Sequence, residues 1–142
     1  MDGSRCATAR GTGGMMVERA PRDEVDFTRY VLLALGSSPG LRVWRQNVGS
    51  VPVRGSTRIF SAGPPRGAAD ISGIIAPEGW RLELEIKMGA RRRSCAQVTW
   101  ATMVRSMGGV YVLYTYDNTL SVSANLVLVA SAVSGELSSR RA

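Results

Sequence analysis

Apolar and charged residues alternate over one short stretch near the middle of the chain. In residues 82–87, Leu-Glu-Leu-Glu-Ile-Lys, each apolar residue is followed by a charged one. A period of two indicates a half-buried strand with its charged groups on one face. A second β-prone run covers residues 69–76, and the Pro-Glu-Gly sequence at 77–79 favours a turn between the two runs. The pattern predicts a β-hairpin whose second strand carries three charges side by side.

The register of this hairpin decides which side chains meet. If Asp70 pairs with Glu85, their Cβ atoms lie about 5 Å apart. A slip of one residue places the two carboxylates on opposite faces of the sheet, and a kink at Gly67 or a bulge also re-aims Asp70. The sequence leaves the register open. In the first register the carboxylates repel each other unless a cation lies between them, and Mg²⁺ prefers such oxygen ligands.

Lysine occurs only once in the chain, on the charged strand. All but one of the 18 basic residues are arginine, and the exception is Lys87. A lysine is a compact point charge, and beside two carboxylates it suits phosphate chemistry, where it positions a water nucleophile and stabilises developing negative charge. The alternative is a solvated Glu/Lys face on an edge strand without a catalytic role.

The rest of the pattern predicts an α/β fold with a mixed central sheet flanked by helices. A buried strand that follows a helix after the charged strand indicates a crossover connection. Residues 120–133 are ambiguous, because their β-branched residues favour a strand and their length favours a helix, which we expect. The other predicted elements are a helix capped by Asp23 and ending at Gly36, strands at 41–45 and 57–61, a helix capped by Ser94 and ending at Gly108, and a strand at 110–116.

Composition narrows the possible functions. The formal net charge of +7 and a pI near 10.4 suit a polyanionic partner such as nucleic acid. The absence of histidine excludes imidazole-based acid–base catalysis and the common zinc sites, and the two cysteines, Cys6 and Cys95, are too few for a four-ligand site. We expect both cysteines to be free thiols in a reducing compartment.

The 142 residues suit one domain with one core. We expect a disordered basic tail at residues 1–20, a folded domain at 21–134 and a polar tail at 135–142. No apolar run reaches the roughly 18–20 residues that span a membrane, and the longest candidate, residues 126–133, is too short. No secretory signal is evident, so we expect a cytosolic protein without a membrane partner.

The chain resembles the PD-(D/E)XK nuclease superfamily, whose core motif is an aspartate on one strand and Glu-x-Lys on the next. Within it, the chain is most similar to the small stand-alone VRR-NUC domains common in phages. Ala69 stands where the superfamily name has proline. The resemblance covers roughly residues 22–116, and the matching pieces, in order, are Glu24, residues 45–49 (Arg-Gln-Asn-Val-Gly), 67–71 (Gly-Ala-Ala-Asp-Ile), 85–87 (Glu-Ile-Lys), Gln97 and 108–112 (Gly-Gly-Val-Tyr-Val).

The resemblance implies a restriction-endonuclease-like core and a Mg²⁺ site, with Mn²⁺ able to substitute. It implies that Asp70, Glu85 and the Ile86 backbone carbonyl hold the metal, and that Lys87 activates the attacking water. Gln97 steadies the nucleophile. For Glu24 the resemblance implies a second metal or a metal-bound water, whereas the residue pattern alone favours stabilisation of the helix dipole.

The expected function is hydrolysis of phosphodiester bonds in DNA. The resemblance implies a structure-selective endonuclease of the Holliday-junction-resolvase type, acting as a homodimer on branched DNA such as a four-way junction or a flap. One alternative is a non-catalytic nucleic-acid-binding module that retains the nuclease fold; another is a restriction-type enzyme that cuts ordinary duplex. The expected DNA contacts are Arg45, Gln46, Asn47, Arg66, Arg91, Arg92 and Arg93.

Overall fold

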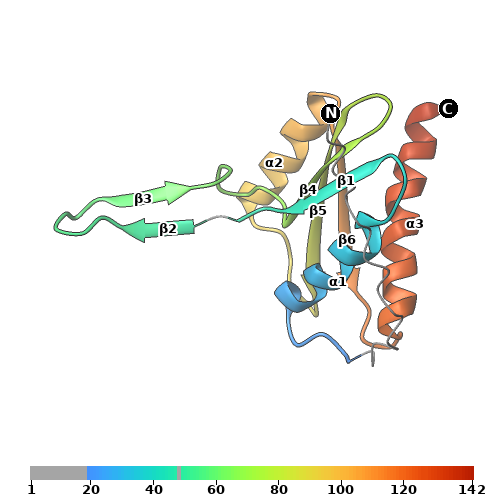
Figure 1. Cartoon of the computed structure of the whole chain (residues 1–142), viewed down its shortest axis with the longest axis horizontal. Coiled ribbons are helices and arrows are strands. Elements are labelled where there is room, and N and C mark those ends of the chain that lie inside the picture. Colours follow the sequence, from blue (N-terminus) through green and yellow to red (C-terminus); the bar gives the residue numbers. More distant parts are fainter. Residues whose placement is uncertain (1–18, 48) are drawn as a thin grey trace, which may run out of the picture.

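The charged strand lies inside a four-stranded mixed sheet. The computed structural model describes residues 19–47 and 49–142. Strand β5 (Trp80–Met88) lies between β4 (Ile71–Ile75) and β6 (Val110–Tyr116), and β1 (Leu41–Arg45) completes the order β1-β4-β5-β6 (Figure 1). Strand β4 runs antiparallel to both of its neighbours, β1 and β5. Strand β6 runs parallel to β5 after the crossover helix α2 (Cys95–Ser106). The predicted mixed sheet and crossover are confirmed.

The β4–β5 hairpin has the register that brings the two carboxylates together. Ile71 pairs with Leu84, and Ser72 pairs with Glu83. Asp70 directly precedes this ladder and therefore continues it opposite Glu85. The alternative slip of one residue is excluded.

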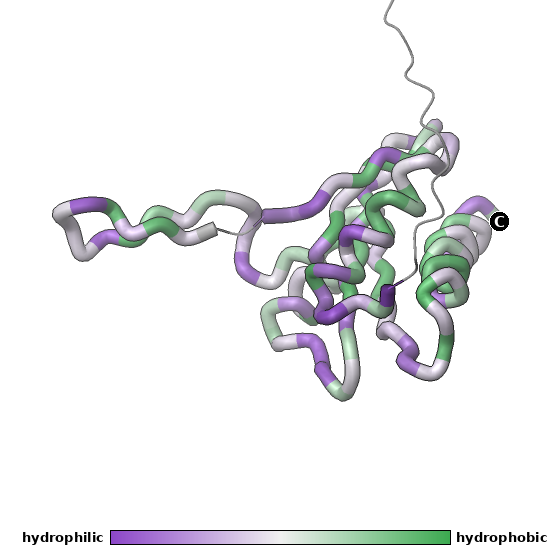
Figure 2. The backbone as a smooth tube through the Cα atoms, turned by 60° about the horizontal axis from the view of Figure 1, so that its bottom comes forward, coloured by the Kyte–Doolittle hydropathy of each residue, from purple (hydrophilic) through white to green (hydrophobic). Residues whose placement is uncertain are grey.

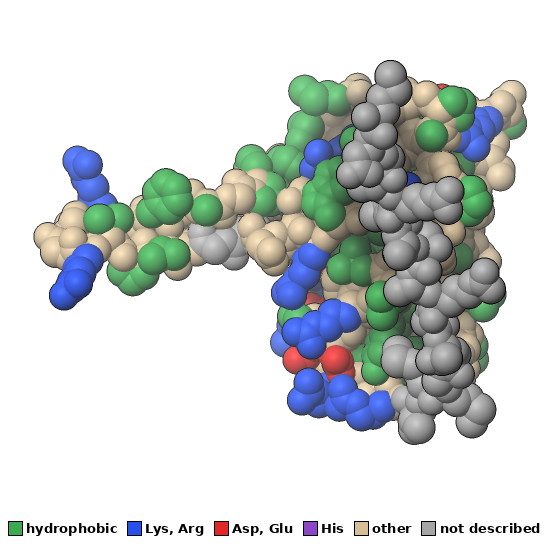
Figure 3. All heavy atoms as spheres, in the orientation of Figure 1, with side chains coloured by type: hydrophobic (Ala, Val, Ile, Leu, Met, Phe, Trp, Pro, Cys, Tyr) green, Lys and Arg blue, Asp and Glu red, His purple; other side chains and the backbone are tan. Residues whose placement is uncertain are grey.

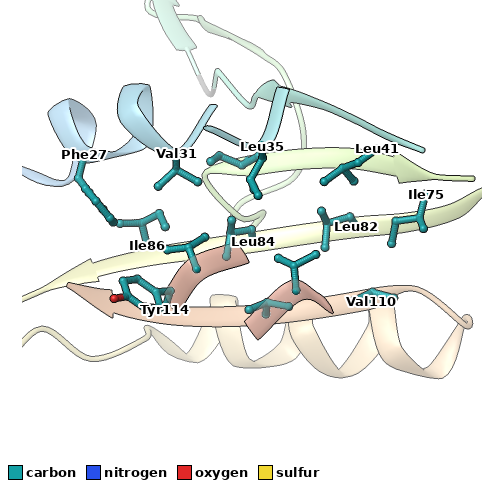
Figure 4. Close-up of a cluster of buried hydrophobic side chains, with 14 of the residues drawn as sticks. Phe27, Val31, Leu35, Leu41, Ile75, Leu82, Leu84, Ile86, Val110 and Tyr114 are labelled. Atoms are coloured by element: carbon teal, nitrogen blue, oxygen red, sulfur yellow. The ribbon is translucent and has the colours of Figure 1, made fainter. Parts of the chain in front are cut away.

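One face of the sheet carries the main core. Helices α1 (Glu24–Gly36) and α3 (Val122–Arg141) cover this face, and alternate residues of β5 point into it (Figure 4). Leu82, Leu84 and Ile86 are completely buried there against side chains such as Phe27 and Val31. The period of two in the sequence thus places every second residue of β5 in an apolar layer.

The opposite face of the sheet carries the charged row, under helix α2. Glu83 and Glu85 are 0% exposed and Lys87 is 8% exposed. Strand β5 also has a neighbour on each side. A solvated Glu/Lys face on an edge strand, one of the two sequence interpretations, is therefore wrong.

The predicted helix boundaries follow from side-chain capping. The Asp23 carboxylate accepts a hydrogen bond from the Asp26 amide (2.8 Å), and α1 extends to Gly36 as expected. Ser94 caps α2 in a reciprocal capping box with Gln97. The ambiguous segment near residue 120 is a helix, capped by Ser121.

A two-stranded arm projects from the sheet between β1 and β4. Strand β2 (Gly49–Pro52) pairs with β3 (Ile59–Ala62) in a separate antiparallel ladder that extends away from the body (Figure 1). The sequence pattern predicted a strand at 57–61, which corresponds to β3 shifted by one or two residues. It did not predict β2.

The C-terminal segment is helical rather than a polar tail. Helix α3 continues to Arg141, so the expectation of a tail at 135–142 is wrong. The Arg140 guanidinium donates to the carbonyl oxygens of Gly108 and Gly109, at 2.7 Å each. The Arg141 guanidinium pairs with the Glu78 carboxylate at 2.7 Å. These contacts bind the last helical turn to the start of β6 and to the β4–β5 turn. Of the predicted tail at 1–20, residues 1–18 lie outside the described residues.

By length and composition, helix α3 is long and apolar enough to cross a membrane. The expectation that no segment is long and apolar enough therefore does not hold for this helix. Core helices of soluble proteins pass the same test, and Val129 and Val133 of α3 are buried in the main core.

We predict that Arg140→Ala lowers the free energy of unfolding by about 2 kcal/mol, because two carbonyl oxygens lose a charged donor. Thermal or urea unfolding followed by circular dichroism measures the change. Ser139→Ala, at an exposed position in the same turn, is the matched control and should stay within about 0.5 kcal/mol of the unmodified protein. Equal stability of the two variants would show that the last turn is an unattached tail.

Candidate functional site

Asp70 is fixed by the strand that pairs with it and by the loop that precedes it. Its Oδ2 atom accepts a hydrogen bond from the Ile86 amide at 2.8 Å. The preceding loop passes close to the N-terminus of α2, where a Cβ on Gly67 would lie 2.4 Å from the Ala96 carbonyl oxygen. Gly67 also has a φ of 96°. Glycine is therefore required here on two counts, and the chain enters β4 with Asp70 aimed toward β5.

Glu85 is a completely buried carboxylate with one unsatisfied oxygen. Its Oε1 atom lies 2.6 Å from the Lys87 ammonium and accepts a hydrogen bond from the Gln97 side-chain amide. Its Oε2 atom is buried and has no hydrogen-bond partner among the described residues. A buried carboxylate oxygen without a partner is costly, so the fold maintains an unfavourable arrangement at this position.

Burial and nearby negative charges raise the pKa of both carboxyls. Burial raises the pKa of Glu85 to about 7, the negative charge of Asp70 adds to the rise, and the hydrogen bond from Lys87 opposes it. Burial also raises the pKa of Asp70, against the hydrogen bond from Ile86 and the positive charge of Lys87. A bound cation would remove the repulsion that contributes to both shifts.

Glu24 lies close to this pair but already has protein partners. Its Oε1 atom accepts a hydrogen bond from the Met88 amide at 3.2 Å, and its Oε2 atom lies 3.5 Å from the Arg91 guanidinium. The charge of Glu24 contributes to the raised pKa of both Asp70 and Glu85. Its side chain thus joins the first turn of α1 to the end of β5, which goes beyond the helix-dipole interaction.

The three consecutive arginines surround the entrance to Lys87. A cleft of about 340 Å³ is lined by Lys87, by Arg91, Arg92 and Arg93, and by side chains of β6. Basic side chains also surround the acidic ones visible on the lower part of the body in Figure 3. The cleft gives an anion access to the lysine, as phosphate binding requires.

The other predicted DNA contacts divide into two groups. Arg45, Asn47 and Arg66 are exposed. The positive charge of Arg45 opposes the rise in the pKa of Asp70. Gln46, in contrast, is half-buried and its side-chain amide donates to the Ser72 hydroxyl. Its role as a DNA contact stays a prediction, and its observed contact is internal.

Glu83 organises a buried network that the sequence analysis did not single out. Its carboxylate accepts hydrogen bonds from the Ser72 hydroxyl (2.7 Å), Arg81 Nε (2.7 Å), Trp100 Nε1 (3.1 Å) and the Ala69 amide (3.3 Å). These bonds fix the residue before Asp70 and the inner face of α2. The signal in the sequence was that Glu83 is the first glutamate of the Glu-x-Glu pair and so falls on the same face of the strand as Glu85.

Tyr111 is a further buried residue near Glu85 that the sequence analysis did not single out. It is 1% exposed, and its hydroxyl has no hydrogen-bond partner among the described residues. Burial raises its pKa to about 12, and the negative charge of Glu85 adds to this rise. The Arg93 guanidinium lies 5.9 Å from the ring centre. Its position early in an apolar strand gave no sign of this environment.

The donors present fit a hard divalent cation with two protein carboxylates. Among the described residues, no group of three or more His, Cys, Asp and Glu side chains is arranged to hold a metal ion. Proteins hold Mg²⁺ through one or two carboxylates, with waters and substrate phosphates completing the shell. The free buried oxygen of Glu85, beside the Asp70 carboxylate, matches that requirement.

No known family model matches the chain, and no curated protein is significantly similar to it in sequence.

The metal-free protein should lose stability as the pH rises. The pKa of Glu85 is about 7 in the folded state against an ordinary 4.5, so the unfolded chain releases this proton first. We expect the free energy of unfolding to fall between about pH 4.5 and 7, by on the order of 1–3 kcal/mol. Glu85→Gln should remove most of this decline. Urea titrations in chelator at several pH values measure it, and an equal decline in the variant would contradict the assignment.

A Glu→Gln substitution at position 83 should destabilise the protein, whereas the same substitution at position 85 should not. In Glu83→Gln one carboxylate oxygen becomes an amide nitrogen, which cannot accept the hydrogen bonds donated to it in the unmodified protein. We therefore expect the free energy of unfolding to fall by about 3 kcal/mol at neutral pH. Glu85→Gln should be at least as stable as the unmodified protein at pH 8, because its amide oxygen still accepts from Lys87 and Gln97. Glu136→Gln, in a surface pair with Arg140 at 3.7 Å, is the control for a change of charge. Equal losses at positions 83 and 85 would refute the distinction.

Proposed function

We propose that the protein is a metal-dependent deoxyribonuclease with a restriction-endonuclease-like core, a member of the PD-(D/E)XK superfamily similar to VRR-NUC domains. One observation carries the proposal. Among the residues that the structure describes, one buried oxygen of Glu85 has no hydrogen-bond partner; Glu85 lies on an inner strand beside Lys87, the only lysine in the sequence, and near Asp70, whose charge acts on it. A purely structural ion pair would leave no reason to bury an unsatisfied carboxylate oxygen beside a second carboxylate.

Asp70, Glu85 and the Ile86 carbonyl are the residues that would hold Mg²⁺ or Mn²⁺. When bound, the ion supplies Lewis-acid stabilisation of the phosphate and a more acidic water. The hydrogen bond from the Ile86 amide keeps the Asp70 carboxylate oriented toward β5. Glu24, held by Met88 and Arg91, contributes negative charge at the site rather than a free ligand.

Lys87 has the position required of the group that orients the nucleophile. Its ammonium contacts Glu85 from one side and lines the arginine-rich cleft on the other. A phosphodiester in that cleft would lie against Lys87, and the ammonium would hold the attacking water and stabilise negative charge on the phosphate. Gln97 holds Glu85 through its side-chain amide and caps its own helix, so it is a positioning residue in this scheme.

The net positive charge and the arginines around the cleft support a polyanionic substrate. In this proposal Arg45, Arg92 and Arg93 contact backbone phosphates of the substrate. By analogy with stand-alone VRR-NUC proteins, we propose branched DNA as the substrate and a homodimer as the active form, since two symmetric sites can nick two strands.

A cleavage assay on four DNA substrates tests the proposal. A labelled four-way junction, a flap, a single strand and a plain duplex are incubated with Mg²⁺, Mn²⁺ or chelator. We expect metal-dependent cutting of a branched substrate and at least a 100-fold loss in Lys87→Ala and Asp70→Ala, with DNA binding retained. Glu136→Gln should cut normally.

The other outcomes have definite meanings. Binding of every substrate without cutting by either metal would leave a nucleic-acid-binding module as the function. Cutting of plain duplex at defined sites would indicate a restriction-type enzyme. A metal titration followed by thermal melting gives an independent readout: Mg²⁺ or Ca²⁺ should stabilise the unmodified protein and have a much smaller effect on Asp70→Asn.

A further inference from the structure

The two-stranded arm presents large apolar side chains that are mostly exposed within the described part of the chain. Val51, Ile59 and Phe60 are 59%, 69% and 63% exposed. The arm's strands have extensive contacts only with each other. Figure 2 shows apolar colour along the strands and polar colour at the tip. An isolated hairpin is marginally stable in water, and exposed apolar groups of this size indicate a surface that binds a partner.

The charge of the arm is of one sign. No Asp or Glu occurs from Gln46 to Ala69, whereas Arg54, Arg58 and Arg66 all lie within this segment. Arg54 and Arg58 are exposed, and basic side chains extend from the tip in Figure 3. The partner of this surface is therefore expected to be an anion.

The base of the arm lies at the candidate catalytic aspartate. The backbone amide of Gln46 donates to the backbone carbonyl oxygen of Asp70 at 2.9 Å, and this hydrogen bond joins the two ends of the arm where it leaves the sheet. Val51 and Phe60 are directly paired and share one face of the arm; Pro52 and Ile59, the next pair, share the other. A partner bound along the arm thus extends from the tip to the site itself.

A second copy of the chain is a poor partner for the arginines at the tip. Its surface carboxylates are largely engaged: Glu78 pairs with Arg141 and Glu136 with Arg140, and the exposed Asp23 and Asp117 accept hydrogen bonds from the backbone amides of Asp26 and Thr119. Duplex DNA offers unbroken rows of phosphates, and its major groove admits a two-stranded β-ribbon.

We propose that the arm is a DNA-binding ribbon that lies in a groove of the duplex flanking the bond to be cut. Arg54 and Arg58 contact phosphates, while Val51 and Phe60 pack on sugar or base edges. From Gly49 to Gly55 the arm reaches roughly 20 Å at about 3.3 Å per residue, which corresponds to about six base pairs. The inference rests on the proposed nuclease function, and it adds the segment that grips the flanking duplex and the length of duplex gripped.

Two arm variants and a charge-matched control test the inference. Arg54→Gln/Arg58→Gln removes the charges at the tip, and Val51→Ser/Phe60→Ser removes one apolar face. The control, Arg29→Gln/Arg42→Gln, removes two exposed arginines outside the arm. Binding to labelled DNA is measured by fluorescence anisotropy in Ca²⁺ at several salt concentrations, cutting is measured in Mg²⁺, and the oligomeric state is measured by light scattering.

We expect the affinity of the unmodified protein to increase as the duplex next to the cut site is lengthened to about six base pairs, and then to level off. The tip variant should bind about tenfold more weakly, with a salt-dependence slope lower by about two, and should lose the dependence on duplex length. The apolar variant should also bind more weakly, with the slope unchanged. Both should cut at the normal rate at saturating protein, because Asp70, Glu85 and Lys87 are intact. The control should keep the length dependence.

Failure of this inference is distinguishable from failure of the nuclease function. If the unmodified protein binds and cuts DNA and both arm variants do so equally well, the inference is wrong while the function stands. It is also wrong if the arm variants become monomeric and their weaker binding follows from that alone, which would make the arm a contact between copies. If the unmodified protein binds no DNA, both proposals fall together.

Discussion

Burial of charge on an inner strand is the constraint on which this structure depends. Glu83, Glu85 and Lys87 occupy one face of β5 under helix α2, and each requires a partner to be tolerated there. Glu83 has a complete set of donors from three segments of the chain. Within the described part of the chain, Glu85 has donors for one oxygen only. The first carboxylate therefore stabilises the fold beside the second, which is buried with its hydrogen bonds incomplete among the described residues.

The other face of the same strand contributes the apolar burial that offsets the cost of burying these charges. Leu82, Leu84 and Ile86 are completely buried under α1 and α3, so the apolar core lies on one side of the sheet and the charged side chains lie on the other. The helix above the charged row contributes small residues such as Ala101 and the polar ends of Gln97 and Trp100. The alternation of apolar and charged residues along β5 thus places the apolar core and the charged side chains in separate layers.

The sequence predicted the features that depend on local pattern. The caps at Asp23 and Ser94 and the parallel crossover follow from short-range rules, and the structure confirms them. The sequence left the register of the β4–β5 hairpin open, and the structure decides it. What it did not predict depends on tertiary contacts. Alternation alone cannot distinguish a face covered by water from a face covered by a helix, so the burial of Glu83 was missed. Strand β2 does not pack on the core, so its sequence carries no apolar alternation that would predict it. The helical end at Arg140 depends on carbonyl groups 31 and 32 residues earlier.

The direct pairing of β1 with β4 makes the segment between them topologically an insertion. Since the Gln46–Asp70 hydrogen bond closes its base, the segment between these residues can lengthen, shorten or change composition without altering any strand of the main sheet. Sequence divergence is then free to accumulate in the arm, whereas the spacing of Glu83, Glu85 and Lys87 is fixed by the pleat of β5. A chain of this kind can change the surface that the arm presents by exchange of a loop-sized module, with its core left unchanged.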